Sequence, residues 1–161
     1  MLLSAFTLFH VVLSLIGLGT GFVVLYGFIA AKRLDGWTPW FLWTTLLTSL
    51  TGFLFPEHQF LPSHAVGILS VIVLGLAFLA LYRFKLYGTW SRVFVICSVV
   101  ALYFNAFVAV AQSFKHIAPL TALAPTQTEP PFGITQLVVL LAFVTLGVMA
   151  TRKSRAVATA Y

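Results

Sequence analysis

The residues best suited to chemistry in this chain are its four histidines. An imidazole can ligate a metal or a haem iron, and it can move a proton near neutral pH. Amide side chains are predicted to lie at a similar depth on the outer side of a helical bundle. Several polar groups would then line one pocket for a small molecule. The residues predicted to line that pocket are His10, Asn105, Gln112, His116 and Gln136.

A haem or a metal ion is the second chemistry that these residues allow. For a haem, the predicted ligands are His10 and His64, because they belong to different apolar segments at the same membrane boundary. For a metal ion, His58 and Glu57 join them. The spacing matches no strong motif, since Glu57-His58 lacks the H-E-x-x-H pattern. The alternative is that the histidines only hydrogen-bond the ends of helices, so the cofactor stays unassigned.

The composition of the chain places these residues in a membrane. Of its 161 residues, 61 % are hydrophobic and 7 % are charged, whereas a soluble domain carries about 25 % charged residues. Lipid must therefore cover much of the surface. Because a backbone in lipid satisfies its own hydrogen bonds, and because the apolar runs do not alternate as barrel strands do, they are predicted to be helices. The prediction is one all-α domain over residues 1–161, with five transmembrane helices at residues 3–31, 39–55, 63–82, 91–114 and 132–151.

The basic residues predict how this bundle is oriented. Eight of the nine fall in the first loop, the third loop and the C-terminal tail, and only Lys115 falls on the other side. Under the positive-inside rule the N-terminus is outside and the C-terminus is cytoplasmic. All four tryptophans lie on the basic side and would form an aromatic belt there. No basic cluster extends into a stripe, so nucleic acid is not a predicted partner.

Polar residues inside the spans follow helical spacing. Ser14 and Gly17 share a face of the first span, three threonines share a face of the second, and Asn105 lies near the middle of the fourth. These stripes are expected to meet inside the bundle, where small residues allow close packing and polar groups bond across helices. The loop at residues 115–131 contains four prolines and is predicted to be an extended, non-helical cap on the outer side.

Two segments resemble parts of small bacterial inner-membrane proteins of unknown function. The first runs from Phe53-Leu54-Phe55-Pro56-Glu57-His58 through Pro62-Ser63-His64, and the second is Ala122-Leu123-Ala124-Pro125-Thr126-Gln127-Thr128-Glu129-Pro130-Pro131-Phe132. The resemblance covers most of the chain after Trp40 and implies a multi-pass protein of a bacterial inner membrane. It implies no activity and no catalytic residue.

Three functions fit the sequence. The first is a non-enzymatic membrane protein that binds a partner protein or a small hydrophobic ligand through the outer polar pocket, because no intramembrane carboxylate offers a proton relay. The second is a redox accessory protein that holds haem, metal or quinone at the outer face. The third is a small channel or transporter subunit, alone or as a homo-oligomer. The sequence contains no nucleophile with a nearby base, no phosphate loop and no carboxylate pair, so it does not predict an enzyme.

Overall fold

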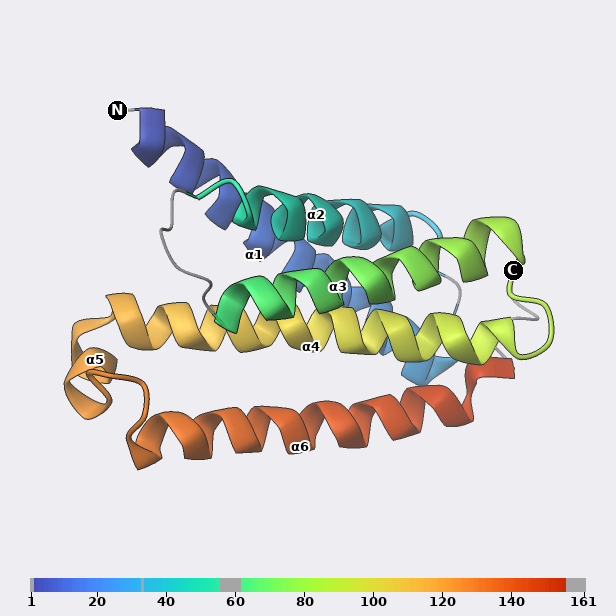
Figure 1. The fold of residues 1–161 in the computed structure, drawn as a ribbon. Helices are drawn as coiled ribbons and strands as arrows, with labels where there is room; N and C mark the ends of the chain where they lie inside the picture. Colours follow the sequence, from blue (N-terminus) through green and yellow to red (C-terminus); the bar gives the residue numbers. More distant parts are fainter. Residues whose placement is uncertain (1, 33, 56–61, 156–161) are drawn as a thin grey trace.

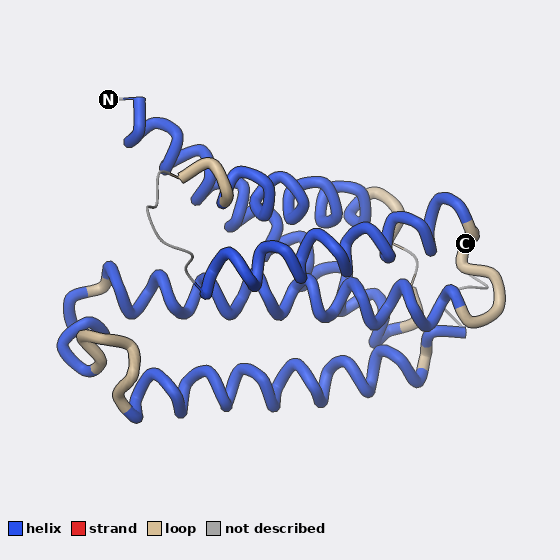
Figure 2. The backbone as a smooth tube through the Cα atoms, in the orientation of Figure 1, coloured by secondary structure: helices blue, strands red, loops and turns tan. Residues whose placement is uncertain are grey.

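The computed structural model describes residues 2–32, 34–55 and 62–155 (Figure 1). Throughout these residues the regular structure is helical and contains no strand, which confirms the prediction of an all-α fold (Figure 2). The helices are α1 (Leu2–Ala30), α2 (Trp37–Gly52), α3 (Pro62–Phe78), η1 (Leu79–Arg83), α4 (Trp90–His116), α5 (Ala118–Leu123) and α6 (Pro130–Arg152).

Four of these helices are long and apolar enough to cross a bilayer. They are Ala5–Ala30 within α1, His64–Arg83 in α3 and η1, α4 and α6, with mean hydropathy between 2.2 and 2.5. The remaining long helix, α2, has 16 residues and is therefore about 24 Å long at 1.5 Å per residue. That length is shorter than the hydrocarbon core of about 30 Å.

The long helices run back and forth along a common direction, so successive ends meet at the two ends of the bundle (Figure 1). We call one of them the basic end, where α4 begins and α6 ends. The opposite end holds the start of α1, the end of α4 and α5. Basic residues of the described chain at the basic end are Lys32, Arg83, Lys85, Arg92, Arg152, Lys153 and Arg155.

The centre of the bundle is α4, which packs against α1, α3 and α6. Phe94, Val95 and Leu102 of α4 are almost completely buried, together with Phe41 of α2. Gly21 makes this packing possible, because a Cβ atom there would lie 2.9 Å from the Phe41 ring. The absence of that atom lets α1 approach both α2 and α4, as small residues do in membrane bundles.

The turn between η1 and α4 positions the start of α4 at the basic end. Gly88 has φ +57°, a conformation that glycine adopts without the strain of a side chain. Leu86 folds back into the core, and its backbone N–H donates to the Ala80 carbonyl at 2.9 Å. The rings of Phe84 and Trp90 stack at 3.9 Å across the turn. These contacts fix the first turn of α4 and therefore the position of Arg92.

The structure corrects one prediction about the loop at residues 115–131. The loop is not extended throughout, because α4 continues to His116 and α5 occupies Ala118–Leu123. Proline is tolerated in the first turn of a helix, where its missing N–H would have no partner in any case, and Pro119 is the second residue of α5. The prolines therefore begin short helices here as well as interrupting them.

Candidate functional site

His10 joins the first two helices near the opposite end of the bundle. Its Nδ1 atom lies 2.8 Å from the Thr51 hydroxyl of α2, and its ring meets the Phe55 ring edge-on at 5.1 Å. The side chain is half-buried. His10 Nδ1 therefore makes a hydrogen bond between α1 and α2. This is the helix-contact role that the sequence offered as the alternative to ligand binding.

Helices α1, α2 and α4 meet at a cluster that we call the three-helix junction. Its residues are Ser14, Gly17, Thr44, Thr45 and Asn105. The Ser14 hydroxyl donates to Asn105 Oδ1 at 2.9 Å, and Asn105 Nδ2 donates to the Ser14 carbonyl at 3.2 Å. A Cβ atom on Gly17 would lie 3.0 Å from Thr45 Oγ1 and 3.2 Å from Asn105 Nδ2. The predicted polar stripes therefore meet here, where a larger residue than glycine would press against the side chains of α2 and α4.

Three buried polar atoms in the described part of the chain have no hydrogen-bond partner. They are Thr45 Oγ1 at the junction, Ser98 Oγ on α4 and Gln136 Oε1 on α6. The Gln136 amide nitrogen does bond, donating to the Phe107 carbonyl at 3.1 Å. Gln136 therefore links α6 to α4 through its amide nitrogen, while its amide oxygen is a buried acceptor without a partner.

The other predicted pocket residues lie further apart. Gln112 and His116 expose their side chains along the last turns of α4, whereas Asn105 is buried at the junction. His10 lies one turn of α1 before Ser14, so it is the predicted residue next to Asn105 along the bundle. The structure thus brings His10 and Asn105 to neighbouring levels and leaves Gln112 and His116 on the surface.

The predicted metal and haem ligands are only partly within the described residues. His64 is half-buried with its ring 6.1 Å from that of Phe53, while His58 and Glu57 lie outside the described residues. Among residues 2–32, 34–55 and 62–155, no three histidine, cysteine, aspartate or glutamate side chains come close enough to share a metal ion. Metal or haem ligation therefore stays a prediction, as do the quinone and channel alternatives.

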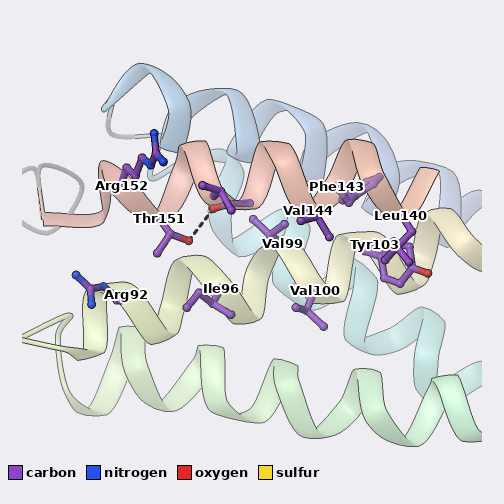
Figure 3. A pocket seen from close by; sticks show the side chains of 12 residues that line it. Arg92, Ile96, Val99, Val100, Tyr103, Leu140, Phe143, Val144, Thr151 and Arg152 are labelled. Carbon is purple, nitrogen blue, oxygen red and sulfur yellow. Dashed lines mark hydrogen bonds between the residues drawn. The ribbon is translucent and has the colours of Figure 1, made fainter. Parts of the chain in front are cut away.

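A hollow lies elsewhere in the described part of the bundle, between α4 and α6. It is a groove of about 590 Å³, within the range of about 300–1,000 Å³ that small-molecule sites occupy. Nine of its twelve lining residues are aliphatic or aromatic, or glycine (Figure 3). The full lining is Arg92, Ile96, Val99, Val100, Tyr103, Leu140, Phe143, Val144, Gly147, Val148, Thr151 and Arg152.

The polar residues of this groove are concentrated at the basic end. Arg92 of α4 and Arg152 of α6 are at this end of opposite walls, and their side chains point in different directions, that of Arg152 away from α4 (Figure 3). Thr151 precedes Arg152 on the α6 wall. The Thr151 hydroxyl donates to the Gly147 carbonyl of its own helix at 2.7 Å. No lining residue is acidic, and within the described chain neither arginine forms an ion pair. The groove is therefore apolar along its length and positively charged at one end.

The sequence did not reveal this groove. Arg92 and Arg152 are 60 positions apart and look like ordinary orientation signals at the ends of two spans. The apolar lining residues have the same composition as residues that face lipid. Only the packing of α6 against α4 distinguishes them. No protein-family model, curated protein or solved structure matches the chain, so the groove is interpreted from its own geometry.

Proposed function

We propose that this chain is a non-enzymatic, multi-pass protein of a bacterial inner membrane that binds a small hydrophobic ligand between α4 and α6. The observation that carries the proposal is the apolar groove of about 590 Å³ along those helices. Its walls include the exposed side chains of Ile96, Val144 and Val148. Side chains of this kind favour an apolar occupant over a polar one.

The proposed topology has five membrane-crossing helices, with the N-terminus outside and the C-terminus in the cytoplasm. Four helices have the required length and hydropathy. The fifth, α2, lies alongside α1 and is shorter than its neighbours (Figure 1), and a short span can be accommodated by local thinning of the bilayer. Trp37, Trp40 and Trp43 of α2 expose their rings, as expected near a headgroup region at the cytoplasmic side.

A reporter experiment tests this topology. We expect a fluorescent reporter that folds only in the cytoplasm to be active when fused after Tyr161 and inactive when fused before Met1. A periplasm-specific reporter should give the reverse pattern. Activity of the periplasmic reporter after Tyr161 would contradict the orientation. A reporter inserted in the first loop distinguishes five spans from four, because that loop is cytoplasmic only if α2 crosses.

A lipid-binding experiment tests the ligand site. Full-length protein in detergent is titrated with phosphatidylcholine, a neutral two-chain probe, and bound lipid is counted by native mass spectrometry. Val144→Trp places a large ring in the groove, and we expect it to reduce retained lipid by at least tenfold. Val138→Trp is the matched control, because Val138 is 60 % exposed on the same helix and does not line the groove. Equal retention by both variants would contradict the proposal.

A further inference from the structure

We infer that the groove between α4 and α6 holds one anionic phospholipid, with the phosphate at the basic end that Arg92 and Arg152 line and an acyl chain along the apolar walls. This inference rests on the proposed function, because it names the chemical class of the hydrophobic ligand. It assigns a ligand-binding role to two arginines that the sequence identifies only as orientation signals. Three properties of the groove support it: its length, its charge and the aromatic residues at the end opposite the arginines.

The length of the groove matches one leaflet of a bilayer. Its α4 wall runs from Arg92 to Tyr103 and its α6 wall from Leu140 to Arg152. At 1.5 Å per residue, these walls are about 17 and 18 Å long. The hydrocarbon core of a bilayer is about 30 Å thick, so one leaflet contributes about 15 Å. A lipid chain that starts at the arginines therefore reaches the far end of the groove near the bilayer midplane.

The deep end of the groove is aromatic. The rings of Tyr103 and Phe143 lie 5.7 Å apart there, one from each wall, and both residues line the groove. Phe143 is buried. An acyl chain needs no polar partner at its tip, and these rings provide apolar surface without a charge. The groove thus changes from charged to mainly apolar in the direction in which a phospholipid does, and the Tyr103 hydroxyl is the polar group at its far end.

The charge at the basic end selects an anion. Arg92 and Arg152 both line this end of the groove, and no lining residue is acidic. A guanidinium binds phosphate oxygens through paired N–H donors. Arg92 also lies in the first turn of α4, where the helix dipole disfavours a cation. A phosphate beside it would offset that unfavourable interaction. Basic sites between helices on the cytoplasmic side favour anionic headgroups for the same reason.

A second copy of this chain fits the groove less well than a lipid does. Two copies related by a two-fold axis along the membrane normal would present the same face to each other. Their basic ends would then lie at the same depth, and four arginines would converge with no acid in either lining. An anionic headgroup, in contrast, neutralises the pair that one chain provides.

The test compares phosphatidylglycerol with phosphatidylcholine on the detergent-solubilised full chain, with bound lipid counted by native mass spectrometry. For the wild type we expect one tightly bound phosphatidylglycerol, preferred roughly 30-fold over phosphatidylcholine, the contribution expected of two arginines at a membrane surface. The double variant Arg92→Gln/Arg152→Gln should lose that preference and still retain phosphatidylcholine. The matched control is Lys153→Gln/Arg155→Gln, which removes the same charge from exposed residues at the same end and should keep the preference.

The possible outcomes separate this inference from the proposed function. A preference that survives in Arg92→Gln/Arg152→Gln, or that falls equally in Lys153→Gln/Arg155→Gln, overturns the anionic site. In either case Val144→Trp should still release phosphatidylcholine if the groove is the binding site. If Val144→Trp retains both lipids as the wild type does, the groove itself is wrong. If the purified wild type is a dimer whose dissociation is required for lipid binding, a second copy is the occupant instead.

Discussion

The three-helix junction and the groove between α4 and α6 solve the same packing problem in opposite ways. At the junction, a Cβ atom on Gly17 would lie only 3.0 Å from Thr45 Oγ1, and Ser14 and Asn105 bond directly across the contact. At the groove, a Cβ atom on Gly147 of α6 would lie 3.3 Å from Val99 Cγ1 of α4. The surrounding side chains, however, leave an open volume.

This difference is visible in how much of each helix is buried. Half of the apolar window of α4 is buried inside the protein, whereas only 11 % of the α6 window is. α4 is therefore covered largely by other parts of the protein, while most of α6 is not. We therefore expect substitutions at the junction to affect the fold more than substitutions on the wall of the groove do.

The largest expected effect comes from breaking the junction with Gly17→Leu. Any side chain at this position meets Thr45 Oγ1 and Asn105 Nδ2, so we expect the free energy of unfolding to fall by about 3 kcal/mol or more, the upper range for overpacking. Unfolding in mixed micelles of increasing SDS content measures it. Gly19→Leu is the control, because nothing lies within 4 Å of a Cβ at Gly19. Similar losses in both variants would contradict the assigned role of the junction.

The next effect comes from removing the polar contact within the junction. Asn105→Leu deletes both hydrogen bonds with Ser14, and we expect a loss of about 1–2 kcal/mol, typical of polar contacts between membrane helices. Gln112→Leu, two turns along the same helix and exposed, should change stability by less than about 0.5 kcal/mol. A double-mutant cycle with Ser14→Ala isolates the pair. A coupling energy near zero would show that the two side chains act independently.

The third effect is confined to the loop that leads into α6. The Glu129 carboxylate accepts from the Thr126 hydroxyl at 2.8 Å and from the Thr128 amide at 3.1 Å. Partial loss of water raises the pKa of this carboxyl, but those hydrogen bonds lower it by more, so the pKa of Glu129 lies below its ordinary value. Its contribution to loop order is complete above about pH 4.3, the ordinary pKa of a glutamate, and is lost as the pH falls through the lowered pKa.

Hydrogen exchange measures this loop effect directly. We expect the protection factors of the Thr126 and Thr128 amides to fall as the pH is lowered below about 4.3, while amides at the junction keep theirs. Glu129→Gln should have low protection in the loop at every pH, because a neutral amide is a weaker acceptor than a carboxylate. Protection that is independent of pH in the wild type would contradict the role assigned to Glu129.

The sequence predicted the helices and the junction better than it predicted the groove. Long apolar runs set the helix ends to within a few residues, because lipid allows little else. Helical spacing placed Ser14, Gly17 and Asn105 on faces that meet, and the structure confirms their contact. The sequence does not predict the short helix α5, because the prolines of this loop predict a break in helical structure. Proline is also tolerated in the first turn of a helix, where Pro119 lies in α5.

The groove could not be predicted for a physical reason. Side chains such as Ile96 and Val148 are apolar whether they face lipid, protein or an empty volume, so hydropathy does not separate these environments. Arg92 and Arg152 line the same groove only because α6 packs along α4 with its last turn beside the first turn of α4. That relation depends on tertiary packing and has no signature in the local sequence.

The smallest expected effect on stability is the most informative for the comparison. Val144 is 54 % exposed on the wall of the groove, so Val144→Trp should change the free energy of unfolding by no more than about 0.5 kcal/mol. The same SDS titration measures this, in lipid-depleted micelles so that a bound lipid does not add stability. A stable variant that has lost lipid binding would separate the groove from the fold. A loss as large as that of Gly17→Leu would mean that α6 is packed as tightly as the junction, and the distinction between the two regions would fail.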